Sequence, residues 1–419
     1  MKPNILFVHA VCPAQFSDLC EYLNSSGAAN AYYMTTPGNL ARNKDRYRNL
    51  LPLIPDGDIM AGNSCFFSGK VERAGKISIG LHRGLEKLLK TLKIDLIVAH
   101  GSWGSPHLIF GEFDIPIITY IEFPSYADHG WDPRYPPTQS QQLVDKNMQM
   151  LSYYQAMKSQ LTLVPSEYAR GMFPESLRQG IFARFEGFDP AKIARREASS
   201  VQLPSGVKLL GFAARDLSSA KGLEIFITTA AWLIERHKDI YFVIIGDPKS
   251  TTYSYEQIFL DRIYGKGKGA TFVSYLMAKH AVDPTRFILT GKLPYAQYSD
   301  LVHHIDLFMY PVQYGSGNWG LMELLIRGRP VIASDRCYVA EMITDQFNGV
   351  LVASDSPAVW GEAIEVLLND EGRRTMLGEN AKTSAGAYTL PNVAPSYLAL
   401  FKKVIRAYRI ARDNASRPH

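Results

Sequence analysis

Residues 314–335, YGSGNWGLMELLIRGRPVIASD, contain three kinds of local pattern in succession. A glycine-rich loop begins the stretch, an amphipathic helical pattern follows it, and Gly328 separates that helix from the apolar run PVIAS. A loop, a helix and a strand in this order are typical of a parallel α/β sheet. In such sheets, ligands bind beyond the carboxyl ends of the strands, where loops lead into helices. The stretch therefore predicts both a fold class and the place of a binding site.

The same alternation extends through both halves of the chain. Strands are expected at 5–9, 96–99, 115–121, 161–164, 207–214, 240–246, 287–290, 307–310 and 330–333, and helices at 15–23, 79–92, 141–160, 358–369 and 395–412. The polar stretch 189–206 is interpreted as an interdomain linker, and 254–270 as an insertion or loop at a sheet edge. We therefore predict two Rossmann-like α/β domains, at 1–190 and 206–392, that face each other across a cleft. A C-terminal helix at 393–419 is expected to pack back on the first domain.

The totals of the chain exclude several classes of protein. Its 419 residues are too many for one ordinary core, and 46% hydrophobic and 20% charged residues are typical of a globular protein. A net charge of +5 fits an anionic substrate or a membrane surface, and is too small to indicate nucleic acid. The chain has no CxxC pair, signal-peptide pattern or long apolar window, so we expect a cytoplasmic protein with free thiols.

Two cations lie in the loop after the first strand of the second half. Arg215 and Lys221 belong to the sequence GFAARDLSSAKGLE, and this loop faces the same crevice as the glycine-rich loop at 314–320. Each cation alone is usually a solvated loop residue. Arginine binds phosphate oxygens as a fork and lysine as a point charge, and bare backbone at a helix N-terminus also attracts anions. Together these features indicate a diphosphate site.

Several motifs in the second half resemble those of a known family. They are R-x5-KG at 215–222, GD at 246–247, FILTGKLPYAQYSDLVHHIDLFMYP at 287–311 and E-x4-GRPVIASD at 323–335. These resemble the C-terminal domain of retaining family 4 glycosyltransferases, which have the GT-B fold. ILFVHAVCPAQF and IVAHGSWG resemble N-terminal sequences of a bacterial subgroup of that family.

The resemblance implies a nucleotide-diphosphate sugar as donor substrate and no metal cofactor. It implies that Arg215 and Lys221 bind the diphosphate, and that Glu323 holds the ribose. Backbone around Lys292 and Leu293 would contact the base. The loop residues near the phosphates or the sugar would be Ser316, Gly317, Asn318, Trp319 and Gly320.

The chain departs from the family pattern eight residues before Glu323. Most members have a glutamate at this position, and here it is Gly315. Because the family glutamate is associated with the donor sugar, the sequence does not indicate which residue here makes its usual contacts to that sugar. Trp319 could stack on a sugar or pack under the loop.

Polar residues are also expected at strand ends of the N-terminal domain. Family members often have a histidine near the anomeric carbon of the donor. That position falls at Ile121 or Glu122 in PIITYIEFPSY, so Glu122 is a candidate. His100 ends a neighbouring strand, and it either reaches a substrate or bonds its own loop. Gln15 either contacts an acceptor or caps a helix.

Two charged stretches have ordinary interpretations beside functional ones. The basic amphipathic pattern at 75–93 fits a helix lying on the inner face of a membrane, or a sheet-covering helix with a solvated face. The DGD at 56–58 imitates a metal-binding motif but follows Pro55, and we interpret it as a turn. No metal site is predicted.

The sequence thus predicts a retaining glycosyltransferase with a saccharide, lipid-linked or small-molecule acceptor. A catalytically degenerate nucleotide-sugar-binding subunit is one alternative, supported by Gly315 and by the missing histidine near Ile121. A nucleotide-sugar 2-epimerase is another, and it would need acid/base groups around the sugar. A dehydrogenase is disfavoured because neither first strand is followed by G-x-G-x-x-G. The sugar, the base, the acceptor and the oligomeric state are not indicated.

Overall fold

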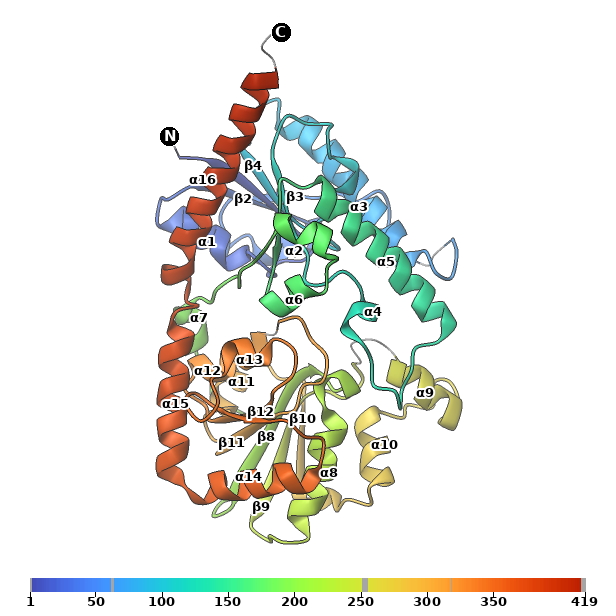
Figure 1. Ribbon diagram of the computed structural model, residues 1–419, viewed down its shortest axis with the longest axis vertical. Coiled ribbons are helices and arrows are strands. Elements are labelled where there is room, and N and C mark those ends of the chain that lie inside the picture. Colours follow the sequence, from blue (N-terminus) through green and yellow to red (C-terminus); the bar gives the residue numbers. More distant parts are fainter. Residues whose placement is uncertain (1, 62–63, 251–254, 318, 416–419) are drawn as a thin grey trace. The chain divides into compact units, whose positions relative to one another are not determined.

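The computed structural model describes residues 2–61, 64–250, 255–317 and 319–415 (Figure 1). The chain divides into two compact units. Unit 1 consists of Met1–Asp128, Gln139–Asp189 and Tyr388–His419, and unit 2 of His129–Thr138 and Pro190–Ala387. Each unit has its own parallel sheet with helices packed against it, which confirms the predicted α/β class.

Unit 1 is built on a parallel sheet with the strand order β3-β2-β1-β4-β5-β6-β7. Its strands are β1 (Asn4–Val8), β2 (Asn30–Thr35), β3 (Leu50–Pro52), β4 (Leu96–His100), β5 (Ile117–Tyr120), β6 (Leu161–Val164) and β7 (Ile181–Ala183). The chain passes from β1 to β2 on one side and reaches β4 on the other, so the strand order reverses between β1 and β4. Such a switch point opens a crevice at the carboxyl ends of the strands.

Helices cover both faces of the unit 1 sheet. They are α1 (Ser17–Ser25), α2 (Pro37–Asn43), α3 (Gly69–Leu88), α4 (Tyr126–His129), α5 (Gln139–Lys158), α6 (Glu167–Gly171) and α16 (Leu390–Ala415), with short 3-10 turns η1 (Pro106–Leu108) and η2 (Glu175–Gly180). α1 and α16 pack together on one face, where Phe7, Leu19 and Phe401 share a core (Figure 1). The long C-terminal helix is therefore part of unit 1.

The basic helix α3 covers the opposite face of this sheet. It begins at Gly69, earlier than the sequence pattern predicts, because its first turns are mostly polar and carry no apolar stripe. Ile77, Leu81 and Leu85 are fully buried against Leu6. The apolar stripe of α3 therefore faces the sheet, as in the sheet-covering interpretation. Among the described residues, no helix is long and apolar enough to cross a membrane.

Unit 2 has a parallel sheet with the order β10-β9-β8-β11-β12-β13, which reverses between β8 and β11. Its strands are β8 (Lys208–Asp216), β9 (Ile240–Asp247), β10 (Phe287–Gly291), β11 (Leu307–Tyr310), β12 (Val331–Ser334) and β13 (Val350–Val352). Its helices are α7 (Pro190–Ala194), α8 (Leu223–Ile234), α9 (Tyr255–Tyr264), α10 (Phe272–Lys279), α11 (Tyr295–Leu301), α12 (Trp319–Ile326), α13 (Val339–Met342), α14 (Pro357–Asn369) and α15 (Glu371–Gly386), with η3 (Ser219–Lys221) and η4 (Pro284–Arg286).

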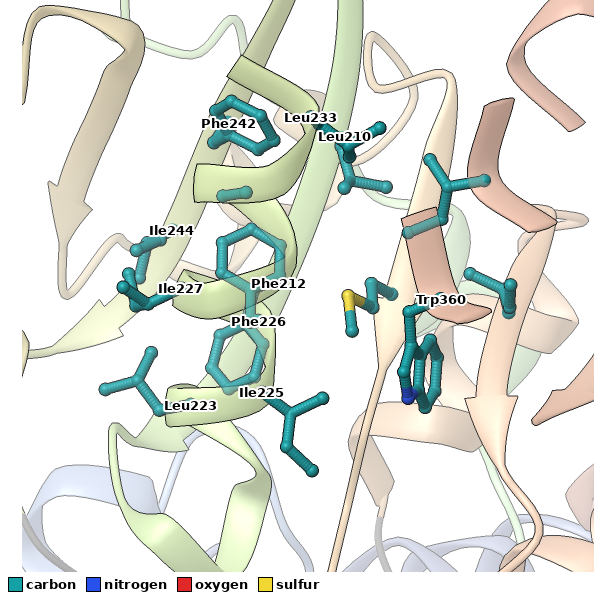
Figure 2. Close-up of a cluster of buried hydrophobic side chains, with 14 of the residues drawn as sticks. Leu210, Phe212, Leu223, Ile225, Phe226, Ile227, Leu233, Phe242, Ile244 and Trp360 are labelled. Atoms are coloured by element: carbon teal, nitrogen blue, oxygen red, sulfur yellow. The ribbon is translucent and has the colours of Figure 1, made fainter. Parts of the chain in front are cut away.

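The core of unit 2 lies between α8 and the central strands. Figure 2 shows Phe226 and Ile227 of α8 beside Phe212 and Ile244 of the strands. α8 is apolar on nearly every side, so it is buried almost along its whole length. The loop that precedes α8 is thereby held on a rigid support.

Two segments of unit 2 differ from the sequence prediction. The stretch 254–270, expected to be an insertion or loop at a sheet edge, contains the helix α9, which buries Tyr255 and Leu260. The stretch 189–206, expected to be a linker, begins with α7 and then lies against unit 2, where Glu197 N donates to Ala296 O at 3.2 Å and Ser199 N to Asp300 Oδ2 at 3.0 Å. Both contacts depend on partners distant in sequence, which composition does not reveal.

The segment His129–Thr138 interrupts unit 1 in sequence and belongs to unit 2. Tyr135 is 2% exposed and lies edge-on to Phe259 and Phe272. Its hydroxyl donates to the buried carboxylate of Glu224 at 2.7 Å. Further donors complete this carboxylate's shell, namely Arg134 at 3.0 Å, Lys279 at 2.7 Å and His280 at 2.9 Å. A short segment from the first half of the chain is thus part of the core of unit 2.

We predict that Gly222→Ala destabilises the protein by at least about 2 kcal/mol. Gly222 precedes α8 with a φ of 75°, and a Cβ there would lie 1.8 Å from the carbonyl oxygen of Pro311. Chemical unfolding measures the loss. Gly372→Ala in α15 is the control, because its Cβ would approach nothing closer than Asp370 Oδ1 at 3.6 Å. Equal stability of the two variants would contradict the prediction.

Candidate functional site

Two loops meet at the switch point of unit 2. The first follows β8 and runs through η3 to Gly222, and the second follows β11 and leads into α12. Gln313 N and Tyr314 N both donate to Ala220 O, at 2.8 and 3.1 Å. Because Gly222 has no side chain, Pro311 can lie directly on it. The two loops are therefore fixed to each other by backbone contacts.

The first loop carries both predicted cations. Arg215 is largely exposed, and its guanidinium donates to the buried carboxylate of Asp216 at 3.1 Å. Lys221 ends η3, one residue before the N-terminus of α8. Burial and the charge of Lys221 lower the pKa of His129 to about 3, so this neighbour stays neutral. The structure thus brings both cations to the edge where the strand order reverses.

Glu323 lies in α12, mostly buried, with its carboxylate held from two directions. Tyr295 donates its hydroxyl to Oε1 at 2.9 Å, and Arg327 Nη1 lies 4.0 Å from Oε2. Burial raises the pKa of Glu323, and the charge of Arg327 opposes that rise. Tyr295 begins α11 directly after the loop of Lys292 and Leu293, so these expected nucleoside-binding groups are linked. Tyr295 is absent from the sequence prediction because only its contact with Glu323 distinguishes it.

The residues of the glycine-rich loop differ in how deeply they are buried. Ser316 is buried, whereas Gly317, Trp319 and Gly320 are half-buried, and Asn318 lies outside the described residues. Lys192 Nζ of α7 lies 5.9 Å from the centre of the Trp319 ring and 6.0 Å from that of Tyr295. The predicted linker thus contributes a cation beside this site.

Unit 1 has a polar cluster at its own switch point. His100 ends β4, and His9 directly follows β1, with ring centroids 4.8 Å apart in an edge-on contact. His100 Nδ1 accepts from the backbone N–H of Ser102 at 3.1 Å and of Trp103 at 3.2 Å, and His9 Nδ1 accepts from Val11 N at 2.9 Å. A neutral imidazole that accepts at Nδ1 carries its proton on Nε2. Both rings are therefore hydrogen-bond donors at Nε2, and His100 bonds its own loop.

Glu122 follows β5 and completes this cluster. Gln15 donates its amide Nε2 to Glu122 Oε1, and it also hydrogen-bonds His9. Gln15 thereby connects the ends of β1 and β5. His9 is missing from the sequence prediction, although it ends a strand just as His100 does. The same pattern could have found it.

Comparison with known proteins identifies the family. Residues 56–193 match the glycosyl transferase family 4 group, and residues 195–384 match glycosyl transferases group 1. The chain belongs to the family 4 (group 1) glycosyltransferases. This confirms the resemblance read from the motifs, and the family is a retaining one.

Similar proteins within this family act on different molecules. The chain is 24% identical over 226 residues to the D-inositol 3-phosphate glycosyltransferase of Corynebacterium urealyticum, covering 53% of this chain and 50% of the relative. It is 24% identical to the alpha-D-kanosaminyltransferase of Streptomyces kanamyceticus, covering 45% and 44%. The chain thus spans about half the length of the curated relatives it matches.

Solved structures of other proteins share the fold. A sucrose-phosphate synthase from Thermosynechococcus elongatus matches with a TM-score of 0.70 at 14% identity, over 97% of this chain and 100% of that one. Anabaena Alr3699/HepE in complex with UDP-glucose matches with a TM-score of 0.64 at 12% identity, over 96% and 99%. The likeness confirms the GT-B fold for this family 4 glycosyltransferase.

The residue that departs from the family pattern, Gly315, has a physical explanation. It is buried, and a Cβ there would lie 2.9 Å from Cε1 of Tyr338. Tyr338 is itself fully buried, with its hydroxyl 2.7 Å from that of Tyr310. An aromatic ring therefore occupies the space that a side chain at 315 would need.

We predict that Gly315→Ala destabilises the protein by about 1–3 kcal/mol, and that Gly315→Glu costs more. The added atoms would collide with a ring that packing holds in place. The cost should fall when Tyr338→Leu is combined with Gly315→Ala, as measured by chemical unfolding of the single and double variants. Full stability of Gly315→Glu with faster donor turnover would contradict the explanation.

The paired histidines of unit 1 predict a pH-dependent stability. Burial lowers the pKa of His9 to about 3, and burial with the neighbouring His9 lowers that of His100 well below its usual value. Below about pH 6.5 the unfolded chain therefore binds more protons than the folded one. The neutral rings therefore contribute to the free energy of unfolding above pH 6.5. This contribution is lost as the pH falls, by about 1.4 kcal/mol per pH unit for each ring.

The variant His100→Asn tests this, because an amide oxygen can replace Nδ1 as the acceptor of the loop N–H groups. The slope of the unfolding free energy against pH, measured between pH 6 and 4, should be smaller by one proton in the variant. An unchanged slope would mean that His100 is protonated in the folded protein.

Among the described residues, no group of three His, Cys, Asp or Glu side chains could hold a metal ion. In the DGD stretch, Asp58 accepts from Met60 N at 2.8 Å, and Asp56 pairs with Arg83 at 2.6 Å. Their carboxylates thus have structural partners.

Proposed function

We propose that the protein is a retaining glycosyltransferase that moves a glycosyl group from a nucleotide-diphosphate sugar to an acceptor hydroxyl. The observation that carries this proposal is the pair of loops at the switch point of unit 2. They hold Arg215 and Lys221 at the edge where a bound nucleotide is expected in such a sheet. Glu323 lies on the helix that follows the second loop.

The donor is divided among these groups according to their chemistry. Glu323 accepts hydrogen bonds from the ribose, and the backbone at Lys292 and Leu293 contacts the base. Arg215 and Lys221 bind the diphosphate, together with backbone amides of the loop from Ser316 to Gly320. UDP is the first nucleotide to test, since UDP-glucose was bound by a protein of the same fold.

The transfer breaks the bond between the anomeric carbon and the diphosphate oxygen and forms one to the acceptor oxygen on the same face of the sugar. The acceptor's hydroxyl proton goes to the departing diphosphate. Negative charge develops on that group, and Arg215 and Lys221 stabilise it electrostatically. The usual family carboxylate at position 315 has no counterpart here. Arg215 and Lys221 therefore supply a larger part of the transition-state stabilisation.

Unit 1 supplies the acceptor side. The geometry supports His100 as a hydrogen-bond donor and not as a base, because its Nδ1 is already occupied. Glu122 accepts a hydrogen bond from Gln15 at the end of β5, and we assign it to the acceptor hydroxyl. The curated relatives carry names of cyclic polyols and amino sugars, so a small molecule of this class is the first acceptor to test, before saccharide or lipid-linked ones.

Nucleotide binding by the Lys221→Ala variant tests the proposal. The melting temperature of the wild type should rise with one nucleoside diphosphate. The wild type should also slowly hydrolyse the nucleotide sugar that contains this nucleoside diphosphate. Lys221→Ala should bind roughly 10- to 100-fold more weakly, because a charge-assisted hydrogen bond is lost. Lys238→Ala removes the same charge at an exposed position before β9 and should bind normally.

The outcomes separate the alternatives. No stabilisation by any of UDP, GDP or ADP would overturn the proposal. Nucleotide binding without hydrolysis, and without transfer to any acceptor, would favour a degenerate binding subunit. Conversion of the donor into its 2-epimer would favour an epimerase.

A further inference from the structure

Arg73, on the helix α3 of unit 1, is a half-buried cation that lacks a counter-charge. Its guanidinium carbon lies 4.3 Å from the centre of the Trp103 ring. Its Nε is buried without a hydrogen-bond partner among the described residues, and none of their carboxylates forms an ion pair with it. Burial lowers the pKa of Arg73, as expected of a charge removed from water.

Two other buried cations, Arg327 and Lys70, have partners, whereas Arg184 and Arg329 resemble Arg73 in having one buried guanidinium nitrogen without a hydrogen-bond partner among the described residues. Arg327 donates to the hydroxyls of Tyr295 and Ser299 and to a backbone carbonyl. Lys70, one turn from Arg73 on α3, pairs with Asp145 at 3.4 Å. Burying a charge is costly unless a partner is present, so a half-buried guanidinium with no carboxylate paired to it gains from binding an anion.

Arg73 is connected to the switch point of unit 1 through a stack of rings. Trp103 lies in the loop after β4, and its ring stacks on that of His9 with centroids 6.4 Å apart. Trp103 O accepts from Ala10 N at 2.7 Å, which fixes the loops after β1 and β4 to each other. His100 contacts His9 edge-on, and its buried Nε2 has no partner among the described residues.

We propose that unit 1 binds an anionic oxygen group of the acceptor, a phosphate monoester or a carboxylate, with Arg73 as its main ligand. The fork of a guanidinium matches both groups, and Trp103 holds that fork in place. Of the two neutral imidazoles in this cluster, only His100 has an Nε2–H without a partner among the described residues, because that of His9 bonds Gln15. A neutral hydroxyl acceptor would leave the cation uncompensated.

This inference rests on the proposed function only in assigning the anion to the acceptor. The donor's own diphosphate is a second source of the same chemistry. The experiment therefore measures donor and acceptor separately, and it includes a binding measurement that requires no turnover.

The binding measurement uses inorganic phosphate in the presence of a saturating nucleoside diphosphate, which fills the site of unit 2. Phosphate should raise the melting temperature of the wild type further, and Arg73→Gln should lose this second increase. Arg83→Gln, on the same helix with an exposed partner, is the matched control and should retain it. Arg73→Lys should bind phosphate with intermediate affinity, because it keeps the charge but not the fork.

The kinetic measurement compares polyol acceptors with and without a phosphate or carboxylate group. Arg73→Gln should raise the KM of the anionic acceptor roughly 10- to 100-fold and leave the donor KM and donor hydrolysis unchanged. A rise in the donor KM instead would assign Arg73 to the diphosphate and overturn the proposal. Equal use of neutral and anionic acceptors by the wild type would also overturn it. If the wild type does not bind any nucleoside diphosphate, that result would instead refute the proposed function.

Discussion

Both units depend on one constraint, the meeting of two loops at the carboxyl ends of parallel strands. A parallel sheet places the ends of all its strands at one edge, and a reversal of strand order leaves room there for a ligand. In unit 2 this edge is fixed by the backbone of Ala220, which accepts from Gln313 and Tyr314. In unit 1 the equivalent contact joins Ala10 to Trp103. These backbone contacts fix the loops that carry the polar side chains of each switch point.

Charged side chains are paired differently in unit 2 and at the switch point of unit 1. In unit 2, cations and carboxylates mostly compensate each other, as around Glu224 and between Arg327 and Glu323. In unit 1, the cluster at the switch point contains two neutral imidazoles and the carboxylate of Glu122, which accepts from the amide of Gln15, and Arg73 has no carboxylate paired to it among the described residues. A site that keeps its histidines neutral keeps its hydrogen-bond pattern constant across physiological pH. This suits recognition of a substrate better than proton transfer.

Sequence patterns predict the strands near the site well, because the loops that follow them carry unusual residues. Arg215 and His100 are predicted in this way, each directly after an apolar run, and Lys221 lies six residues after Arg215 in the same loop. Tyr295 and Lys192 could not be found, since their relation to Glu323 and Trp319 depends on how separate helices meet. The sequence also does not reveal the reason for Gly315, because Tyr338 lies further along the chain, just before α13.

The segment His129–Thr138 has a consequence for how the chain is divided. A fragment covering only Pro190–Ala387 contains every strand of the second sheet but lacks Tyr135. Its core would have a hole bordered by Phe259 and Phe272, and the carboxylate of Glu224 would lose a buried partner. During synthesis the ribosome releases this segment long before the sheet that receives it. The second unit is thus complete in sequence only when the first half of the chain is attached.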